Sequence, residues 1–181
     1  MTSVLALLAG LTAAQTIGPA GFYDLCTAQQ AECQPVVQTQ SLTFNDVSRI
    51  NRQVNKDIRP QPEPAGTDVW TIGPRDGDCE DYAMTKRHDL IAAGLGSDRA
   101  RVAVGVAKGG QLHAILVVSF GPNFYILDNL TDELLPAEKS DVRIASIQSP
   151  ENPRVWLKAP GSENAAEPPV FMAQVDVLPP R

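Results

Sequence analysis

Residues 100–128 contain three apolar runs that are separated by two turn signals. The first run alternates valine with smaller residues from Val102 to Val106, which is typical of a strand with one face toward a core. Gly109 and Gly110 mark the first turn, and the sequence GPN marks the second. Together these features predict an antiparallel meander of three strands.

A helix is predicted from Thr43 to Ile58, with Thr43 as its N-cap. Its apolar residues recur at three- and four-residue steps, and they are Phe44, Val47, Ile50, Val54 and Ile58. The following RPQPEPAG segment contains three prolines and a glycine, so it predicts a surface loop from Arg59 to about Thr67.

A second helix should begin near Asp78 and end in the AAGLG stretch, where Gly94 or Gly96 can adopt the left-handed conformation that closes helices. A further strand is expected within DVRIASIQ, residues 141–148. Helices and antiparallel strands in separate segments predict an α+β fold, with this second helix packed against an antiparallel sheet.

The length and the net charge of the chain limit the number of domains and the kinds of partner that it can have. With 181 residues, of which 43% are hydrophobic, the chain can bury one ordinary core and is expected to form a single domain. Its formal net charge of -6, without a basic cluster, opposes binding to nucleic acid and to anionic membrane surfaces, because both are negatively charged.

The two ends of the chain differ from its middle in composition. Residues 1–16, MTSVLALLAGLTAAQT, resemble the apolar and cleavage regions of a signal peptide, although no Lys or Arg precedes the apolar run. This run is too short to span a bilayer, so we expect export to the periplasm without a membrane span; a buried N-terminal helix is the alternative. Residues 159–181 are rich in Pro, Ala and Glu and predict a poorly ordered tail, which leaves a domain over residues 17–158.

Three cysteines divide into a close pair and a single residue. Cys26 and Cys33 lie seven positions apart, and a disulfide between them is plausible in an oxidising compartment. On one straight helix their Cα atoms would be about 10 Å apart, so a helix would have to end between them. Cys79 is left over, and it is either buried and inert or kept free for chemistry.

Cys79 stands at the predicted start of the second helix, where backbone N–H groups and the helix dipole stabilise a thiolate. A cysteine nucleophile needs a base, and His113 lies on a predicted strand from which it can reach the thiol. His88 cannot, because it lies about 13 Å farther along the same helix.

A carboxylate to orient His113 follows from the strand register. If the hairpin pairs Phe120 with Asn123, Ile115 lies opposite Asp128 and His113 is the diagonal neighbour on the same face. A slip of one residue would separate the pair, and a half-buried strand histidine beside an unrelated turn aspartate is the alternative.

Three acids surround Cys79, namely Asp78, Glu80 and Asp81, and acids oppose thiolate formation. They are either ligands of a cation or helix-capping groups, with Asp78 as the N-cap and Asp81 three residues later. Trp70 is a further candidate, either as a cleft or oxyanion-binding residue or as a packing residue.

Three sequence blocks carry a family resemblance: GDCEDY around Cys79, HAILVV beginning at His113 and YILDNLTD around Asp128. In this order, within a region from about Gly21 to Pro136, they resemble the bacterial transglutaminase-like cysteine proteinases. The resemblance implies a transglutaminase-like, papain-like fold and an exported thiol protease. It implies Cys79 as the nucleophile, His113 as general base and later acid, and Asp128 as the orienting carboxylate.

The LapG-type branch of this family releases large cell-surface adhesins during biofilm control and is restrained by an inner-membrane receptor for cyclic di-GMP. The resemblance therefore implies a protein substrate of this kind and such a receptor as a partner. It also implies Ca²⁺ as a cofactor, held beside the nucleophile by the acids that match Asp78, Glu80 and Asp81. Two other functions stay open: acyl transfer to an amine, as in transglutaminases, and a non-catalytic module that binds calcium or a receptor.

Overall fold

The computed structural model describes residues 14–64 and 66–159. Most of the predicted signal peptide and of the predicted tail, namely residues 1–13 and 160–181, lies outside this part. Gln15 and Thr16, which the sequence analysis assigned to the signal peptide, form the edge strand β1. Within the described residues, no helix combines the length and the apolar character that a membrane span requires.

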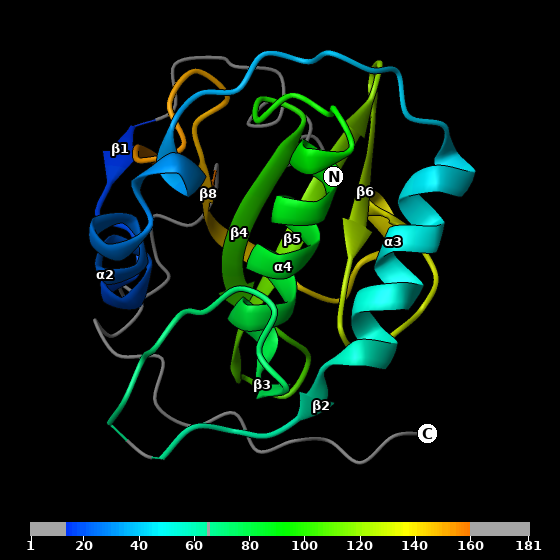
Figure 1. Cartoon of the computed structure of the whole chain (residues 1–181). Coiled ribbons are helices and arrows are strands. Elements are labelled where there is room, and N and C mark those ends of the chain that lie inside the picture. Colours follow the sequence, from blue (N-terminus) through cyan, green and yellow to red (C-terminus); the bar gives the residue numbers. More distant parts are fainter. Residues whose placement is uncertain (1–13, 65, 160–181) are drawn as a thin grey trace.

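An antiparallel sheet of seven strands forms the centre of the fold, in the order β1-β9-β8-β4-β5-β6-β7 (Figure 1). Its strands are β1 (Gln15–Thr16), β4 (Ala100–Val106), β5 (Leu112–Phe120), β6 (Asn123–Leu127), β7 (Leu135–Pro136), β8 (Arg143–Gln148) and β9 (Trp156–Lys158). Strands β4, β5 and β6 are the predicted meander, and β8 is the strand predicted within residues 141–148. A separate parallel pair joins β2 (Arg59–Pro60) to β3 (Asp76–Gly77).

Three α-helices lie on one side of this sheet: α2 (Ala20–Ala28), α3 (Phe44–Asp57) and α4 (Cys79–Ala92) (Figure 1). Strand alternation supplies the helix-facing core with Val102 and Val104 from β4 and with Leu116 from β5. The intervening residues, such as Ala103 and Ile115, form a second cluster on the other face. The α+β fold predicted from the sequence is therefore confirmed.

Helix α3 begins as predicted, because the Oγ1 atom of Thr43 accepts the N–H of Asp46 at 3.2 Å, and the Asp46 carboxylate accepts the N–H of Thr43 at 2.9 Å. Its apolar residues Val47, Ile50 and Val54 are buried, whereas Phe44 at its start is 44% exposed. Helix α4 is buried on nearly every side and includes Lys86 and Arg87 among its buried residues. Gly94 follows α4 with φ +102°, as expected for a left-handed closing residue.

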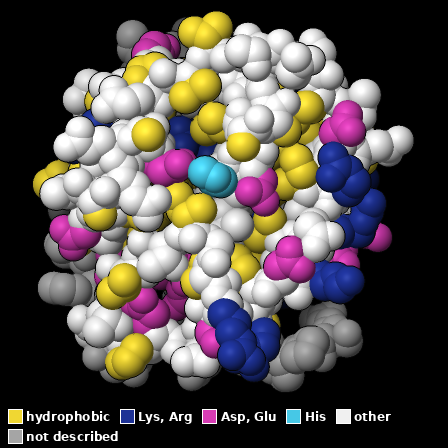
Figure 2. Space-filling view, in the orientation of Figure 1, with side chains coloured by type: hydrophobic (Ala, Val, Ile, Leu, Met, Phe, Trp, Pro, Cys, Tyr) yellow, Lys and Arg dark blue, Asp and Glu magenta, His cyan; other side chains and the backbone are white. Residues whose placement is uncertain are grey.

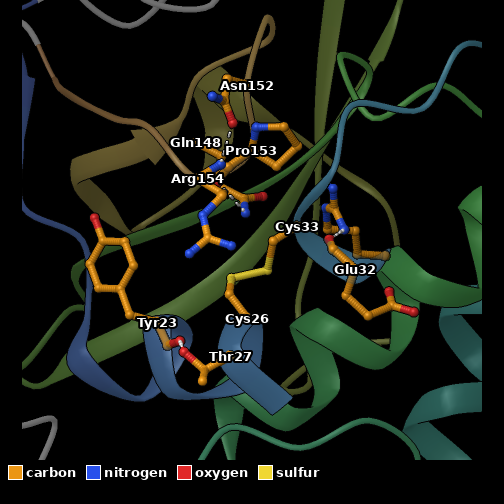
Figure 3. The surroundings of a disulfide bond; sticks show 10 residues. Tyr23, Cys26, Thr27, Glu32, Cys33, Gln148, Asn152, Pro153 and Arg154 are labelled. Atoms are coloured by element: carbon orange, nitrogen blue, oxygen red, sulfur yellow. Dashed lines mark hydrogen bonds between the residues drawn. A yellow bond between two sulfur atoms is a disulfide. The ribbon is translucent and has the colours of Figure 1, made fainter. Parts of the chain in front are cut away.

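Cys26 and Cys33 form the predicted disulfide, with their Cα atoms 5.6 Å apart (Figure 3). Helix α2 ends at Ala28 and a 3₁₀ turn, Gln30–Cys33, returns the chain, which is the helix break that the spacing required. Within this loop, the backbone carbonyl of Glu32 accepts a hydrogen bond from Arg87, and the Glu32 carboxylate pairs with His88. Arg87 and His88 both lie on α4. The disulfide loop therefore supports the middle of α4.

We expect simultaneous replacement of Cys26 and Cys33 by alanine to lower the free energy of unfolding by about 2.5 kcal/mol, because the open chain regains loop entropy. Urea denaturation of the two proteins measures this difference. Mass spectrometry of the non-reduced protein should find these cysteines joined and Cys79 as a free thiol. Two unmodified thiols at positions 26 and 33 under oxidising conditions would contradict the assignment.

Candidate active site

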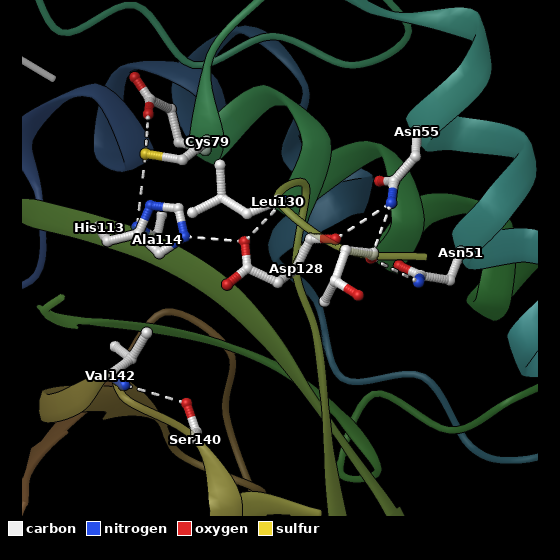
Figure 4. Close-up of polar contacts among 11 residues, drawn as sticks. Asn51, Asn55, Cys79, His113, Ala114, Asp128, Leu130, Ser140 and Val142 are labelled. Atoms are coloured by element: carbon white, nitrogen blue, oxygen red, sulfur yellow. Dashed lines mark hydrogen bonds and ion pairs between the residues drawn. The ribbon is translucent and has the colours of Figure 1, made fainter. Parts of the chain in front are cut away.

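Three elements bring Cys79, His113 and Asp128 together (Figure 4). Cys79 is the first residue of α4, His113 lies in β5, and Asp128 follows the last residue of β6. The hairpin pairs Phe120 with Asn123, which is the register that the His113–Asp128 pair required. All three side chains are buried, and the predicted pair of His113 and Asp128 is present, while the catalytic roles of the three residues stay a prediction.

His113 is oriented by Asp128. Its Nε2 atom lies 2.8 Å from the Asp128 Oδ1 atom, which also accepts the backbone N–H of Leu130 at 3.1 Å. Burial acts to raise the pKa of Asp128, but the hydrogen bond and charge of His113 hold that pKa below its usual range. An ionised carboxylate only accepts hydrogen bonds, so Nε2 carries the proton and Nδ1 is left as a base.

The Cys79 thiol rests beside an acid. Its Sγ atom lies 3.1 Å from the Glu80 Oε2 atom and 3.4 Å from the Ala114 nitrogen, whose N–H it accepts. Among the described residues, no hydrogen bond joins this thiol to His113. Burial, followed by the charge of Glu80, raises the pKa of Cys79 well above its usual value, so the thiol is protonated in this arrangement.

The acids beside the nucleophile include one that the sequence analysis missed. Glu63, Asp78 and Glu80 place one carboxylate oxygen each within 4.8 Å of one another. Glu63 comes from the loop after β2, which the pairing of β2 with β3 brings toward the start of α4. The nitrogen of Glu63 lies 3.4 Å from the Asp78 Oδ2 atom, the acceptor of its N–H.

Asp81 lies outside this cluster, and its role as a cation ligand stays a prediction. Its Oδ1 atom accepts the N–H of Thr71 at 2.7 Å and the Thr71 hydroxyl at 2.8 Å, while Oδ2 accepts the N–H of Asp78 at 3.2 Å. These bonds occupy both carboxylate oxygens. The capping box of the alternative interpretation is present, and Asp81 also holds the preceding loop against α4.

The three clustered acids concentrate negative charge at one place, where a cation could bind. Burial, followed by the negative charge of Asp78, raises the pKa of Glu80 above its usual range, and burial raises the pKa of Glu63. The Asp78 Oδ1 atom is buried without a hydrogen-bond partner within residues 14–64 and 66–159. Oxygen atoms with this spacing suit a hard cation such as Ca²⁺, which binds oxygens at about 2.3–2.6 Å.

Trp70 has a packing position. Its indole N–H donates to the Asp68 Oδ1 atom at 2.8 Å, and its ring contacts the rings of Phe22 and Trp156 at centroid distances of 5.7 and 6.4 Å. The other oxygen of Asp68 accepts the N–H of Gly21. Because its single donor is used in this way, the structure favours the packing alternative over an oxyanion-binding role for Trp70.

Comparison with known proteins places this site in a family. The sequence model of the bacterial transglutaminase-like cysteine proteinases, BTLCP, matches residues 12–164. The chain belongs to this family of cysteine proteinases, and its predicted transglutaminase-like fold is confirmed by the solved structures that it matches. No curated protein sequence matches the chain significantly.

These solved structures include LapG from Legionella pneumophila in a calcium-bound and an EGTA-treated state. The calcium-bound protein has a TM-score of 0.53 and 26% identity, over 61% of this chain and 66% of that chain. The EGTA-treated protein has a TM-score of 0.52 and 25% identity, over 61% and 64%. The match therefore spans slightly less than two thirds of each LapG chain.

Proposed function

We propose that this protein is an exported, calcium-dependent cysteine endopeptidase with Cys79, His113 and Asp128 as its triad. The observation that carries the proposal is the buried 2.8 Å contact between His113 and Asp128, beside the free thiol at the start of α4. Membership in a family of cysteine proteinases supports the same chemistry. The disulfide between Cys26 and Cys33 supports an oxidising location such as the periplasm.

In the proposed reaction, the side chain of Cys79 turns from Glu80 toward His113, whose Nδ1 atom accepts the thiol proton. The Sγ atom attacks the peptide carbonyl carbon, and the first N–H groups of α4, which have no helical acceptor, can donate to the resulting oxyanion. Collapse of this adduct expels the amine, which takes the proton from His113 and leaves a thioester on Cys79.

Water completes the cycle. His113 accepts a proton from the water molecule, whose oxygen attacks the thioester carbonyl, and the Sγ atom of Cys79 leaves as the carboxylic product forms. Asp128 keeps the imidazole in one orientation through both stages, because its carboxylate accepts the Nε2 proton throughout.

Glu63, Asp78 and Glu80 would hold Ca²⁺ in this protein. The cluster supplies three carboxylate oxygens, and the buried Asp78 Oδ1 atom has no hydrogen-bond partner among the described residues. The LapG structure described above contains calcium. A bound ion would engage the carboxylate that now faces the thiol and offset the negative charge that opposes thiolate formation.

The proposed substrate is an extended segment of a large cell-surface adhesin, and the proposed regulator is an inner-membrane receptor for cyclic di-GMP. The likeness to LapG and the three sequence blocks support this more specific role. On the face shown in Figure 2, acidic side chains are spread among neutral ones, and most of the visible basic side chains lie toward the right and lower parts of the view. The acidic side chains on this face agree with the formal net charge of -6.

Proteolysis and acyl transfer share the thioester, so product analysis must separate them. We expect fluorescent casein or a decapeptide library, incubated with the protein and calcium, to yield fragments with free carboxylates. Added primary amine should leave these products largely unchanged. If the masses show mainly amide-linked amine, the transglutaminase-type alternative is correct. Failure of iodoacetamide to label Cys79 rapidly in the presence of calcium would favour a non-catalytic module.

A further inference from the structure

Two asparagines of α3 hold the loop that carries Asp128. Asn51 and Asn55 lie four residues apart, so their side chains share one face of the helix. Both point toward the chain that follows β6 (Figure 4). Asn51 is 0% exposed and lies among the buried apolar residues of α3. An amide in such a place needs hydrogen-bond partners, because it is removed from bulk water.

The partners of both amides are oxygen atoms of this loop. The Nδ2 atom of Asn55 donates to the carbonyls of Asp128 and Thr131 at 3.1 and 3.0 Å. It also donates to the Asp132 Oδ1 atom at 3.1 Å. The Nδ2 atom of Asn51 donates to the Asp132 carbonyl at 3.0 Å and, at 3.4 Å, to the carbonyl of Thr131. Because backbone carbonyls only accept hydrogen bonds, the amide nitrogens supply what the loop requires.

Of the two amides, only that of Asn55 contacts Asp128 within the described residues. Its donor holds the main chain of Asp128 on one side, and the Asp128 Oδ1 atom lies 2.8 Å from the His113 Nε2 atom on the other. The same oxygen accepts the N–H of Leu130, which binds the carboxylate to its own loop. A continuous chain of direct hydrogen bonds therefore runs from α3 through Asp128 to the imidazole.

An aspartate side chain is short, so a shift of its main chain moves the carboxylate with it. We propose that Asn55 is a positioning residue that acts through Asp128: by holding the Asp128 carbonyl, it keeps the carboxylate at hydrogen-bond distance from His113. The inference rests on the proposed function, in which His113 is the base. Asn55 forms no hydrogen bond with Cys79 or His113 in the described part of the chain, so its effect has to pass through Asp128.

Asn55→Leu tests the inference, because leucine has a similar size and no N–H to donate. The bond to Asp128 keeps the neutral His113 ring in the tautomer with its proton on Nε2. Once the carboxylate can move away, a larger share of the rings should carry the proton on Nδ1. The two ring ¹⁵N signals of His113, which differ strongly in a single tautomer, should therefore move toward each other in long-range ¹H–¹⁵N spectra. His88, the only other histidine, serves as the internal reference.

Asn51→Leu is the matched control, since it makes the same chemical change one turn earlier in α3. It removes the donor to Thr131 and Asp132 and leaves the contact with Asp128 in place. We expect this variant to melt at a lower temperature while its His113 signals stay close to those of the unmodified protein. Asn55→Gln returns an amide donor to the loop and should recover part of the original tautomer ratio.

Activity and thermal melting complete the test. We expect Asn55→Leu to lower kcat about 10- to 100-fold with little change in KM, because a misplaced Asp128 weakens the orientation of the base and removes no substrate contact. An asparagine with a merely structural role would lower the melting temperature and leave the His113 signals unchanged, which would overturn the inference. Equal shifts of these signals in Asn51→Leu and Asn55→Leu would also overturn it, because the contact with Asp128 would then have no special part.

The NMR measurement keeps the inference distinguishable from the proposed function, because it needs no substrate. A shift of the His113 signals in a protein that hydrolyses no peptide would reject the proposed protease and retain the link from Asn55 to His113. If Asn55→Leu does not fold, Asn55→Ala removes the same donor without adding apolar surface. Unchanged His113 signals in folded Asn55→Ala protein would refute the link.

Discussion

Replacing Cys79 with alanine will abolish proteolysis, with a loss of about 10³-fold or more in kcat, because no other group in the site can form the thioester. The free, buried thiol at the start of α4 carries this expectation. Hydrolysis of the decapeptide library, followed by mass spectrometry, measures the effect, and circular dichroism checks that the fold is retained. Purified Cys79→Ala protein with full activity would exclude a thiol protease.

The partners of Cys79 provide a graded series with a matched control. His113→Ala should lose nearly as much activity, and Asp128→Asn should lose about 10²- to 10⁴-fold, because the amide no longer enforces the productive tautomer. Asp132→Asn makes the same change in charge four residues later, where the carboxylate accepts from Asn55 and not from His113. Equal losses in Asp128→Asn and Asp132→Asn would show that Asp128 has no special role.

Calcium removal should produce the second large effect. Chelation with EGTA is expected to lower activity reversibly by about 100-fold, since the acids beside Cys79 would then oppose its ionisation without compensation. Iodoacetamide alkylation of Cys79 across pH follows the same change, and its profile should move to lower pH when calcium is added. Superimposable profiles with calcium and with chelator would contradict a link between metal and nucleophile.

Two substitutions test which acids hold the ion. Glu63→Gln should weaken calcium binding about 10- to 100-fold by calorimetry, because it removes a charged ligand. Asp81→Asn makes the same change in charge nearby but should largely preserve affinity, and weakened hydrogen bonds to Thr71 should lower stability by about 1–2 kcal/mol. If Asp81→Asn abolishes the heat of binding and Glu63→Gln does not, the ligand set described above is wrong.

Local patterns predicted the centre of the molecule and most of the triad. The short GPN turn offered a register that joins His113 to Asp128, on the condition that Phe120 pairs with Asn123, and the structure has this pairing. The same local rules predicted Thr43 as the N-cap of α3. These features depend on residues that are close together in the sequence.

The acid cluster could not be predicted in the same way. Glu63 reaches Asp78 only because Arg59–Pro60 pairs with Asp76–Gly77, and strands of two residues have no periodicity that a sequence reveals. Asp81 and Glu80 are neighbouring acids in the same helical turn, yet Thr71 determines that only Asp81 serves as a cap. The burial of Lys86 was missed because a lysine in a helix ordinarily predicts a solvent-facing position.

The loop closed by Cys26 and Cys33 also bears on when the protein becomes fully ordered. Glu32 reaches Arg87 and His88 from inside this loop, so the bond that closes it shortens the tether between α2 and α4. In a reducing compartment the disulfide does not form, so the segment from Cys26 to Cys33 is not closed and Glu32 is less constrained relative to α2. In the proposed exported protein, oxidation of this pair would tighten the support of the helix that carries Cys79, so maturation would follow the change of compartment.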